Sequence, residues 1–157
     1  MAAALQCPDM VDRFGNVWMT AHRDVPFAFR DCDFHYLGQV ALSLDDDLDA
    51  CLLLRKLRLA RVHPDDCSRS GAARLGSRVR FRHGGRPQQV MLVHGSGEAE
   101  GEAVGIGSRT GVGLVGLAAG QSVLWPTRTG KLEELHVLAV ANAEAEDARP
   151  ASGRTGP

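Results

Sequence analysis

The chain has 157 residues, of which 44% are hydrophobic and only 5% are aromatic. A chain of this length forms one domain, or one small domain with an appendage, and its core should consist mainly of valine, leucine and alanine. Because 18 basic residues oppose 19 acidic ones and the net charge is −1, the composition excludes a protein that attracts nucleic acid or anionic membranes through its overall field.

Residues 1–30 carry scattered aromatic side chains but no clear apolar periodicity. Trp18, Phe27 and Phe29 occur in this segment without the spacing of a helix face or of a paired strand. We expect the segment to be poorly ordered or loosely docked, with these rings in satellite packing against whatever surface lies nearby.

Two amphipathic helices are predicted within residues 31–68. Apolar residues from Phe34 to Ala41 fall on one face of the first helix. The second has Ser43 as its candidate N-cap and ends before Pro64. Its roughly 18 residues would span about 27 Å. Since almost no loop separates the two helices, they should form a short antiparallel hairpin of the coiled-coil type.

The apolar period changes from helical to two residues in the segment 76–140. The sequence predicts strands over 77–83, 88–94, 104–107, 122–126 and 132–140, and a short helix over 110–117. These elements favour an antiparallel β domain with one short helix, so the chain as a whole belongs to the α+β class. Residues 141–157 are small and polar and predict a disordered tail.

Four aspartates lie at the predicted tip of the hairpin: Asp45, Asp46, Asp47 and Asp49. One interpretation is that they stabilise the positive end of the second helix dipole and keep the protein soluble. The other is that they present carboxylates to a metal ion held by another protein. We expect no metal site formed by this chain alone, because an aspartate cluster by itself lacks the ligand geometry to hold Mg²⁺ tightly.

Three arginines, Arg78, Arg80 and Arg82, alternate with apolar residues along one predicted strand, and Arg86 follows in the next turn. The arginines form either the solvent face of an antiparallel sheet or a docking surface for an acidic partner. Like charges on neighbouring positions repel each other unless a partner compensates them, so the second interpretation is the functional hypothesis.

No catalytic pattern is present. The glycine run GIGSRTG at 105–111 departs in spacing from the dinucleotide fingerprint and has no following acid at the required position. The four cysteines lack a C-x-x-C spacing, and the histidines and serines form no recognised constellation. We therefore expect a protein that is not an enzyme, with no cofactor and no small-molecule substrate. The glycines instead predict positive-φ turns and close helix–sheet contact.

Neither an apolar run of about 20 residues nor a secretory signal pattern occurs in the chain. Together with the cysteine usage, this predicts a reduced, cytoplasmic protein without membrane contact.

The runs LLLRKLRLARV, LGSRVRFR, VMLVH and GVGLVGLAAGQSVLWPTRTGKLEELHVLAV resemble the bacterial regulator of nucleoside diphosphate kinase (Rnk) family. The resemblance covers about residues 31–140. Its most specific positions are Gly116, Leu117, Gly120, Gln121, Trp125 and Pro126. That family shares its C-terminal domain with the Gre (GreA/GreB) transcript-cleavage factors, so the resemblance implies an FKBP-like domain over 76–140. One departure is Ser108-Arg109-Thr110-Gly111, where the family usually has Ser-Pro-Val-Gly.

The resemblance also implies a partner and a function. Gre factors insert a long hairpin into the RNA polymerase secondary channel, where acidic tip residues help to bind the catalytic Mg²⁺, whereas the hairpin of Rnk-like proteins is much shorter. We therefore expect a non-catalytic regulator that binds RNA polymerase near this channel, with only indirect nucleic-acid contact. Two alternatives stay open, namely an active Gre-like cleavage and elongation factor and a partner-binding module unrelated to transcription.

Overall fold

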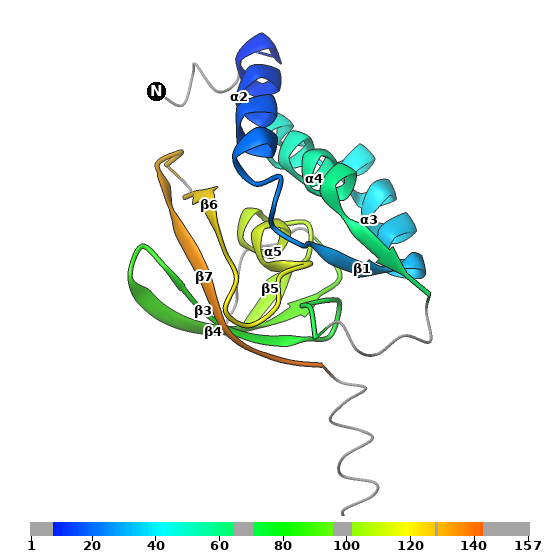
Figure 1. The fold of residues 1–157 in the computed structure, drawn as a ribbon, viewed down its shortest axis with the longest axis vertical. Helices are drawn as coiled ribbons and strands as arrows, with labels where there is room; N and C mark the ends of the chain where they lie inside the picture. Colours follow the sequence, from blue (N-terminus) through cyan, green and yellow to red (C-terminus); the bar gives the residue numbers. More distant parts are fainter. Residues whose placement is uncertain (1–7, 65–70, 96–101, 128, 143–157) are drawn as a thin grey trace, which may run out of the picture.

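The computed structural model describes residues 8–64, 71–95, 102–127 and 129–142. In Figure 1, three helices gather on one side of a curved sheet, and a fourth, short helix lies between them and the sheet. This arrangement confirms the α+β class. The elements in chain order are α2 (Pro8–Ala21), β1 (Ala28–Arg30), α3 (Asp31–Ser43), α4 (Asp47–Leu59), β2 (Arg61–His63), β3 (Arg78–His83), β4 (Arg86–Val93), β5 (Ala103–Gly105), α5 (Arg109–Leu114), β6 (Ser122–Pro126) and β7 (Leu132–Ala141).

The main sheet has the strand order β5-β4-β3-β7-β6, so β3 is its central strand. Along β3, Val79 and Phe81 are fully buried and face α5 and the core, while the arginines between them are exposed. The prediction of an all-antiparallel domain is wrong at one edge, because β5 pairs parallel to β4. A second, two-stranded parallel sheet joins β1 to β2 and was not predicted.

The hairpin helices α3 and α4 are present, but α4 is shorter than predicted. It has 13 residues, which corresponds to about 20 Å. Its N-cap is Asp46 and not Ser43, because the Ser43 hydroxyl donates to the Val40 carbonyl in the last turn of α3 at 2.9 Å. A short connection at 44–46 therefore separates the helices, and the chain leaves α4 early to form β2.

The expectation of a poorly ordered segment over 1–30 is wrong for the residues described here, since Pro8–Ala21 forms the helix α2. Its inner stripe consists of the buried positions Val11, Gly15 and Trp18, and the buried His22 continues this stripe directly after the last residue of the helix. Two of these four are glycine and histidine, which an apolar periodicity does not count, and this explains the failure of the prediction. At Gly15, α2 and α4 approach each other closely. A Cβ added to this glycine would lie only 2.5 Å from the sulfur of Cys51 in α4.

The end of α2 also covers the outer edge of β6. The indole of Trp18 donates to the Leu124 carbonyl at 2.7 Å, and the Leu124 amide donates to Nε2 of His22 at 3.0 Å. Nδ1 of His22 lies 2.7 Å from the Trp18 carbonyl. These contacts require a neutral imidazole with its proton on Nδ1, and they satisfy backbone groups that an edge strand would otherwise leave open.

Acidification is therefore expected to destabilise the protein through His22. Burial is the main cause that lowers the pKa of this imidazole from its usual 6.5; the Trp18 carbonyl raises it, and Lys56 lowers it further. Below about pH 6.5 the unfolded state then binds more protons, so stability present above this pH is lost as the pH falls through the folded-state pKa. Urea unfolding at about pH 7.5 and about pH 5 should show a smaller acid-induced loss in His22→Gln than in the wild type. An unchanged loss in His22→Gln would contradict this role; the control is His35→Gln, whose side chain is 72% exposed.

The glycines of the stretch from 111 to 116 permit close contacts, as predicted. A Cβ on Gly113 would lie 2.7 Å from the indole nitrogen of Trp125. At Gly116 the φ angle is +87°, and a Cβ there would meet the ring of Phe29 at 2.5 Å. The short helix α5 can thus lie directly on a side chain of β6, and the turn that follows it can lie on a side chain of β1.

We expect Gly113→Ala to lower the free energy of unfolding by about 1–3 kcal/mol, because overpacking against Trp125 outweighs the gain in helix propensity of about 1 kcal/mol. The matched control is Gly38→Ala in α3, where an added Cβ meets nothing within 4 Å. It should stabilise the protein by up to about 1 kcal/mol. Thermal unfolding measures both changes, and a stabilised Gly113→Ala variant would refute the close contact.

Two predicted segments fall partly outside the described residues. The hairpin segment was predicted to reach residue 68, and the tail to begin at 141. Residues 65–70 and 143–157 lie outside the described part of the chain. The same holds for residues 1–7 of the N-terminal segment. In the segments that are described, no helix has the length and apolar character that crossing a membrane requires.

Candidate partner-binding site

The tip of the hairpin is bound to the β domain through Arg109. Its guanidinium donates from Nε to Asp49 Oδ1 at 2.7 Å and from Nη2 to Asp46 Oδ2 at 3.2 Å. Nη1 donates to the Thr127 carbonyl at 2.9 Å. Arg109 is the first residue of α5, and its own carbonyl accepts a hydrogen bond from the Trp125 indole. These contacts join α4, α5 and the end of β6.

Burial makes this pairing more than a surface ion pair. The side chains of Arg109 and Asp49 are only 14% and 12% exposed. Burial disfavours the charged guanidinium, but the hydrogen bond and charge of Asp49, together with those of Asp46, outweigh it and raise the pKa of Arg109 above its usual value. Charge-assisted hydrogen bonds in such a partly desolvated site are stronger than those in water.

The four aspartates of the predicted tip do not act together. Asp46 and Asp49 face Arg109, and Asp46 also caps α4 by accepting a hydrogen bond from the Asp49 amide at 2.9 Å. Asp45 and Asp47 are exposed. Across residues 8–64, 71–95, 102–127 and 129–142, no group of three His, Cys, Asp or Glu side chains could hold a metal ion. The cluster is thus divided into two carboxylates that are paired with Arg109 and two that are in solvent. Of the paired ones, Asp49 is buried and Asp46 is half-exposed.

A second contact between the hairpin and the β domain is formed by Lys56. This side chain is fully buried, and its Nζ donates to the carbonyls of Val112 at 2.8 Å and Gly113 at 2.7 Å. The ammonium lies 5.2 Å from the ring centre of Phe27 and 5.5 Å from that of Trp125, so cation–π attraction supplements the hydrogen bonds. Burial lowers the pKa of Lys56 well below 10.5.

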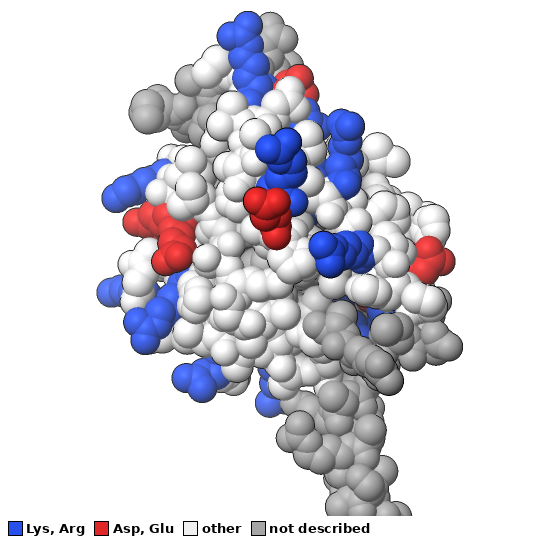
Figure 2. Space-filling view, in the orientation of Figure 1, with Lys and Arg blue, Asp and Glu red and all other residues white. Residues whose placement is uncertain are grey.

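The predicted arginine stripe lies on β3, on the face of the sheet opposite to α5. We call Arg78, Arg80 and Arg82 the arginine row; all three are exposed. Arg86 does not belong to it, because it pairs in register with His83 and therefore shares the other face of the β3–β4 hairpin. Figure 2 shows basic side chains along the lower left margin of the molecule, where Figure 1 draws this hairpin.

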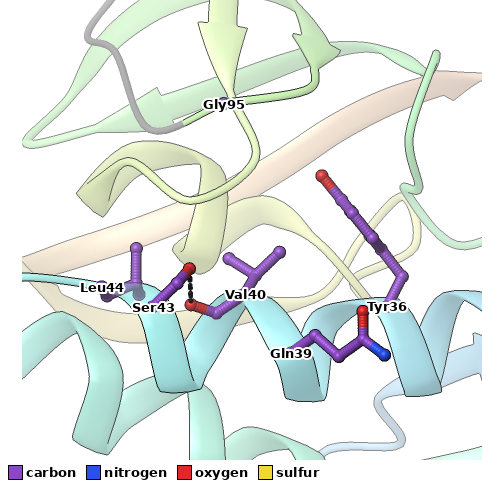
Figure 3. A pocket seen from close by; sticks show the side chains of 6 residues that line it. All are labelled: Tyr36, Gln39, Val40, Ser43, Leu44 and Gly95. Atoms are coloured by element: carbon purple, nitrogen blue, oxygen red, sulfur yellow. Dashed lines mark hydrogen bonds between the residues drawn. The ribbon is translucent and has the colours of Figure 1, made fainter.

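A surface groove of about 410 Å³ lies between α3 and the end of the β4 segment. Figure 3 shows Tyr36 and Val40 directed from α3 toward the segment that carries Gly95. The lining residues are Tyr36, Gln39, Val40, Ser43, Leu44 and Gly95. Since none of these is a carboxylate, an imidazole or a thiol, the groove offers no acid–base pair for catalysis.

A prokaryotic transcription elongation factor GreA/GreB from Nitrosomonas europaea superposes with a TM-score of 0.56 at 23% identity, over 74% of this chain and 98% of that one. The chain has a GreA/GreB-type fold. The GreA factor homolog 1 (Gfh1) of Thermus thermophilus has a TM-score of 0.37 at 17% identity, over 74% of this chain and 99% of that one.

Gfh1 of Thermus aquaticus gives a TM-score of 0.39 at 18% identity, again over 74% of this chain and 99% of the other. No protein-family model matches the sequence, and no curated protein matches it either. The identities are low, so the likeness to the GreA/GreB-type protein concerns the fold.

Sequence reasoning did not identify Arg109 or Lys56 as residues that join the two parts of the molecule. Lys56 follows Leu48 and Leu52 at four-residue spacing, so a lysine on an otherwise apolar stripe was the available signal. For Arg109 the signal was its place in a run where the resembling family usually has proline. Neither signal could reveal the partner, because both partners are far away in the sequence.

Proposed function

We propose that this protein is a non-catalytic regulator that binds RNA polymerase near the secondary channel and modulates transcription. The GreA/GreB-type fold supports a role related to transcription elongation. The resemblance of the segments around 75–82 and 111–140 to the Rnk family supports the same partner and a short hairpin. In this proposal the β domain docks on the polymerase, and the helices limit access to the channel without cutting RNA.

The observation that carries the proposal is that two aspartates at the hairpin tip are already paired with an arginine of the β domain. A cleavage factor must deliver free carboxylates at the end of a projecting prong. Here α4 is only 13 residues long, and Asp46 and Asp49 are already paired with Arg109. To reach a distant Mg²⁺ these carboxylates would have to leave a partly desolvated arginine, which costs free energy with no compensating contact inside this chain.

Two assays test the proposal. Co-purification with core RNA polymerase should recover the protein on the enzyme. Backtracked elongation complexes should release no additional short 3′ RNA when the protein is added, although a known cleavage factor does so in a parallel reaction.

The alternative of a cleavage factor would prevail if the protein released 3′ RNA and the release disappeared in Asp46→Ala and Asp49→Ala. Asp45→Ala and Asp47→Ala serve as matched variants, because these two carboxylates are exposed and carry no part of the Arg109 pairing. If the folded protein did not bind polymerase at all, a partner outside transcription would be the better explanation.

A further inference from the structure

The arginine row occupies the centre of a sheet face that no described helix covers. It lies on β3, the middle strand of five, and the described helices, α2 to α5, lie on the other side of the sheet (Figure 1). The residues beside Arg78 and Arg80 are small, apolar or uncharged: Gln89 and Met91 on β4, and Ala139 and Ala141 on β7. Arg82 is in register with Pro87 on β4 and His136 on β7.

Within the described part of the chain, no carboxylate neutralises the row. Among the described residues, no Asp or Glu oxygen comes within 4.0 Å of the guanidinium groups of Arg78, Arg80 or Arg82. Other arginines of the chain do find such partners, as Arg55 does with Asp12. Three uncompensated guanidinium groups thus point in one direction at a spacing of about 7 Å, set by the two-residue repeat of a strand.

The surroundings of the row favour a protein over a nucleic acid. Proteins that hold single strands combine basic grooves with exposed aromatic rings for base stacking, but Phe81 and Trp125 of this sheet are fully buried on the inner face. Arginine and methionine are instead enriched in protein interfaces, and arginine binds carboxylates there in a bidentate manner.

From these observations we infer that the outer face of β3 is a docking surface for a carboxylate-rich segment of a protein partner. Acidic side chains about 6–7 Å apart, at alternate positions of a strand or four residues apart on a helix, match the spacing of the row. Under the proposed function the partner is RNA polymerase, and this identification rests on that proposal. The docking chemistry itself rests on the row.

The experiment compares three proteins: the wild type, Arg78→Glu/Arg80→Glu, and the control Arg23→Glu/Arg86→Glu. Both double variants change the net charge equally and at exposed positions, but only the first alters the row. Binding to core polymerase is measured at low and moderate salt. Binding to a fluorescent peptide of alternating glutamate and alanine is measured in parallel, together with binding to a 20-nucleotide single-stranded DNA. Melting temperatures verify that all three proteins are folded.

We expect the row variant to lose roughly tenfold or more in affinity for polymerase and for the peptide, with the largest loss at low salt, while the control retains the wild-type affinity. If all three proteins bind polymerase and the peptide equally, the inference is wrong and the proposed function stands. If none binds polymerase, the proposed function fails, and the peptide measurement alone decides the inference.

Two other outcomes would replace the acidic protein segment by a different occupant. Row-dependent binding of the DNA without binding of the peptide would assign the face to nucleic acid. A concentration-dependent dimer in analytical ultracentrifugation that only the row variant disrupts would assign it to a second copy of the chain. Either result would overturn the inference as stated.

Discussion

Replacing Lys56 with alanine is expected to lower the free energy of unfolding by about 3 kcal/mol. The side chain is fully buried, so its removal leaves a cavity between α4 and α5. The carbonyls of Val112 and Gly113 also lose their donors, and an unsatisfied buried acceptor is costly. Urea unfolding followed by tryptophan fluorescence measures the change, since Trp125 lies beside the ammonium.

Lys56→Met separates the opposing contributions of this side chain. Methionine fills a similar volume and removes the cost of burying a charge, but it leaves the same two carbonyls without a donor. We expect a loss of about 1 kcal/mol, clearly smaller than for alanine. A methionine variant more stable than the wild type would show that the hydrogen bonds do not repay the burial of the lysine.

The pH dependence of the same pair of proteins provides an independent measurement. The pKa of Lys56 lies well below 10.5 in the folded protein, so between these two values the unfolded state binds more protons. Below the folded-state pKa, the folded protein bears the full free-energy cost of burying the charge. As the pH rises from that pKa toward 10.5, this cost disappears. The free energy of unfolding of the wild type should therefore rise over this pH range relative to that of Lys56→Met. The chain has only two lysines, Lys56 and Lys131, which makes direct NMR titration practical. A Lys56 signal that titrates at 10.5 would contradict the burial.

Arg109→Ala is the other substitution with a large expected effect, a loss of about 2–4 kcal/mol in the free energy of unfolding. It removes the guanidinium from Asp49, whose side chain is only 12% exposed, and breaks the hydrogen bond to the Thr127 carbonyl. A double-mutant cycle with Asp49→Ala should give a coupling energy of about 1–3 kcal/mol.

The control for this cycle is the surface pair of Lys131 and Glu133, whose charged groups are 3.7 Å apart and whose lysine is 75% exposed. Lys131→Ala should change stability by less than about 0.5 kcal/mol. Hydrogen exchange provides a local measurement, because release of the tip should accelerate exchange of amides in the first turn of α4. Unchanged exchange in Arg109→Ala would mean that other contacts hold the tip.

Both substitutions act on the joint between the helices and the β domain, and this joint matters for the proposed function. Lys56 holds the last turn of α4 on α5, and Arg109 holds its first turn. The α2 helix packs on α4 from its other side, where Arg55 contacts Asp12 and Asn16. Helix α4 of the hairpin is therefore packed between α2 and the β domain and does not project from the molecule. Under our proposal the protein obstructs or signals as a whole and does not extend a prong.

The sequence alone predicted most of the β domain, because local alternation is strong there. The strand predicted over 122–126 coincides with β6, and the alternation of arginine with Val79 and Phe81 predicted both the position of β3 and its exposed face. A strand has only two faces, so the pattern of its own residues decides which side is buried. The glycines near α5 were likewise predicted to serve close contact.

The sequence also predicted two short helices at the positions of α3 and α4, since apolar spacing and a following proline are local signals. It could not decide where Arg109, Lys56 or the aspartates of the tip would find their partners. Those contacts join residues about 60 positions apart, and burial of a lysine or an arginine depends on what the rest of the chain places around it.

The folding of α2 onto the rest of the molecule is another feature that local sequence patterns could not predict. Gly15 in this helix and His22 directly after it become stabilising only because Cys51 and the edge of β6 lie opposite them. Local pattern thus determined the elements and the exposed arginines of this protein. Tertiary packing alone decided that two of the four tip aspartates, Asp46 and Asp49, are paired with Arg109, because charge pairing across the fold has no signature along the chain.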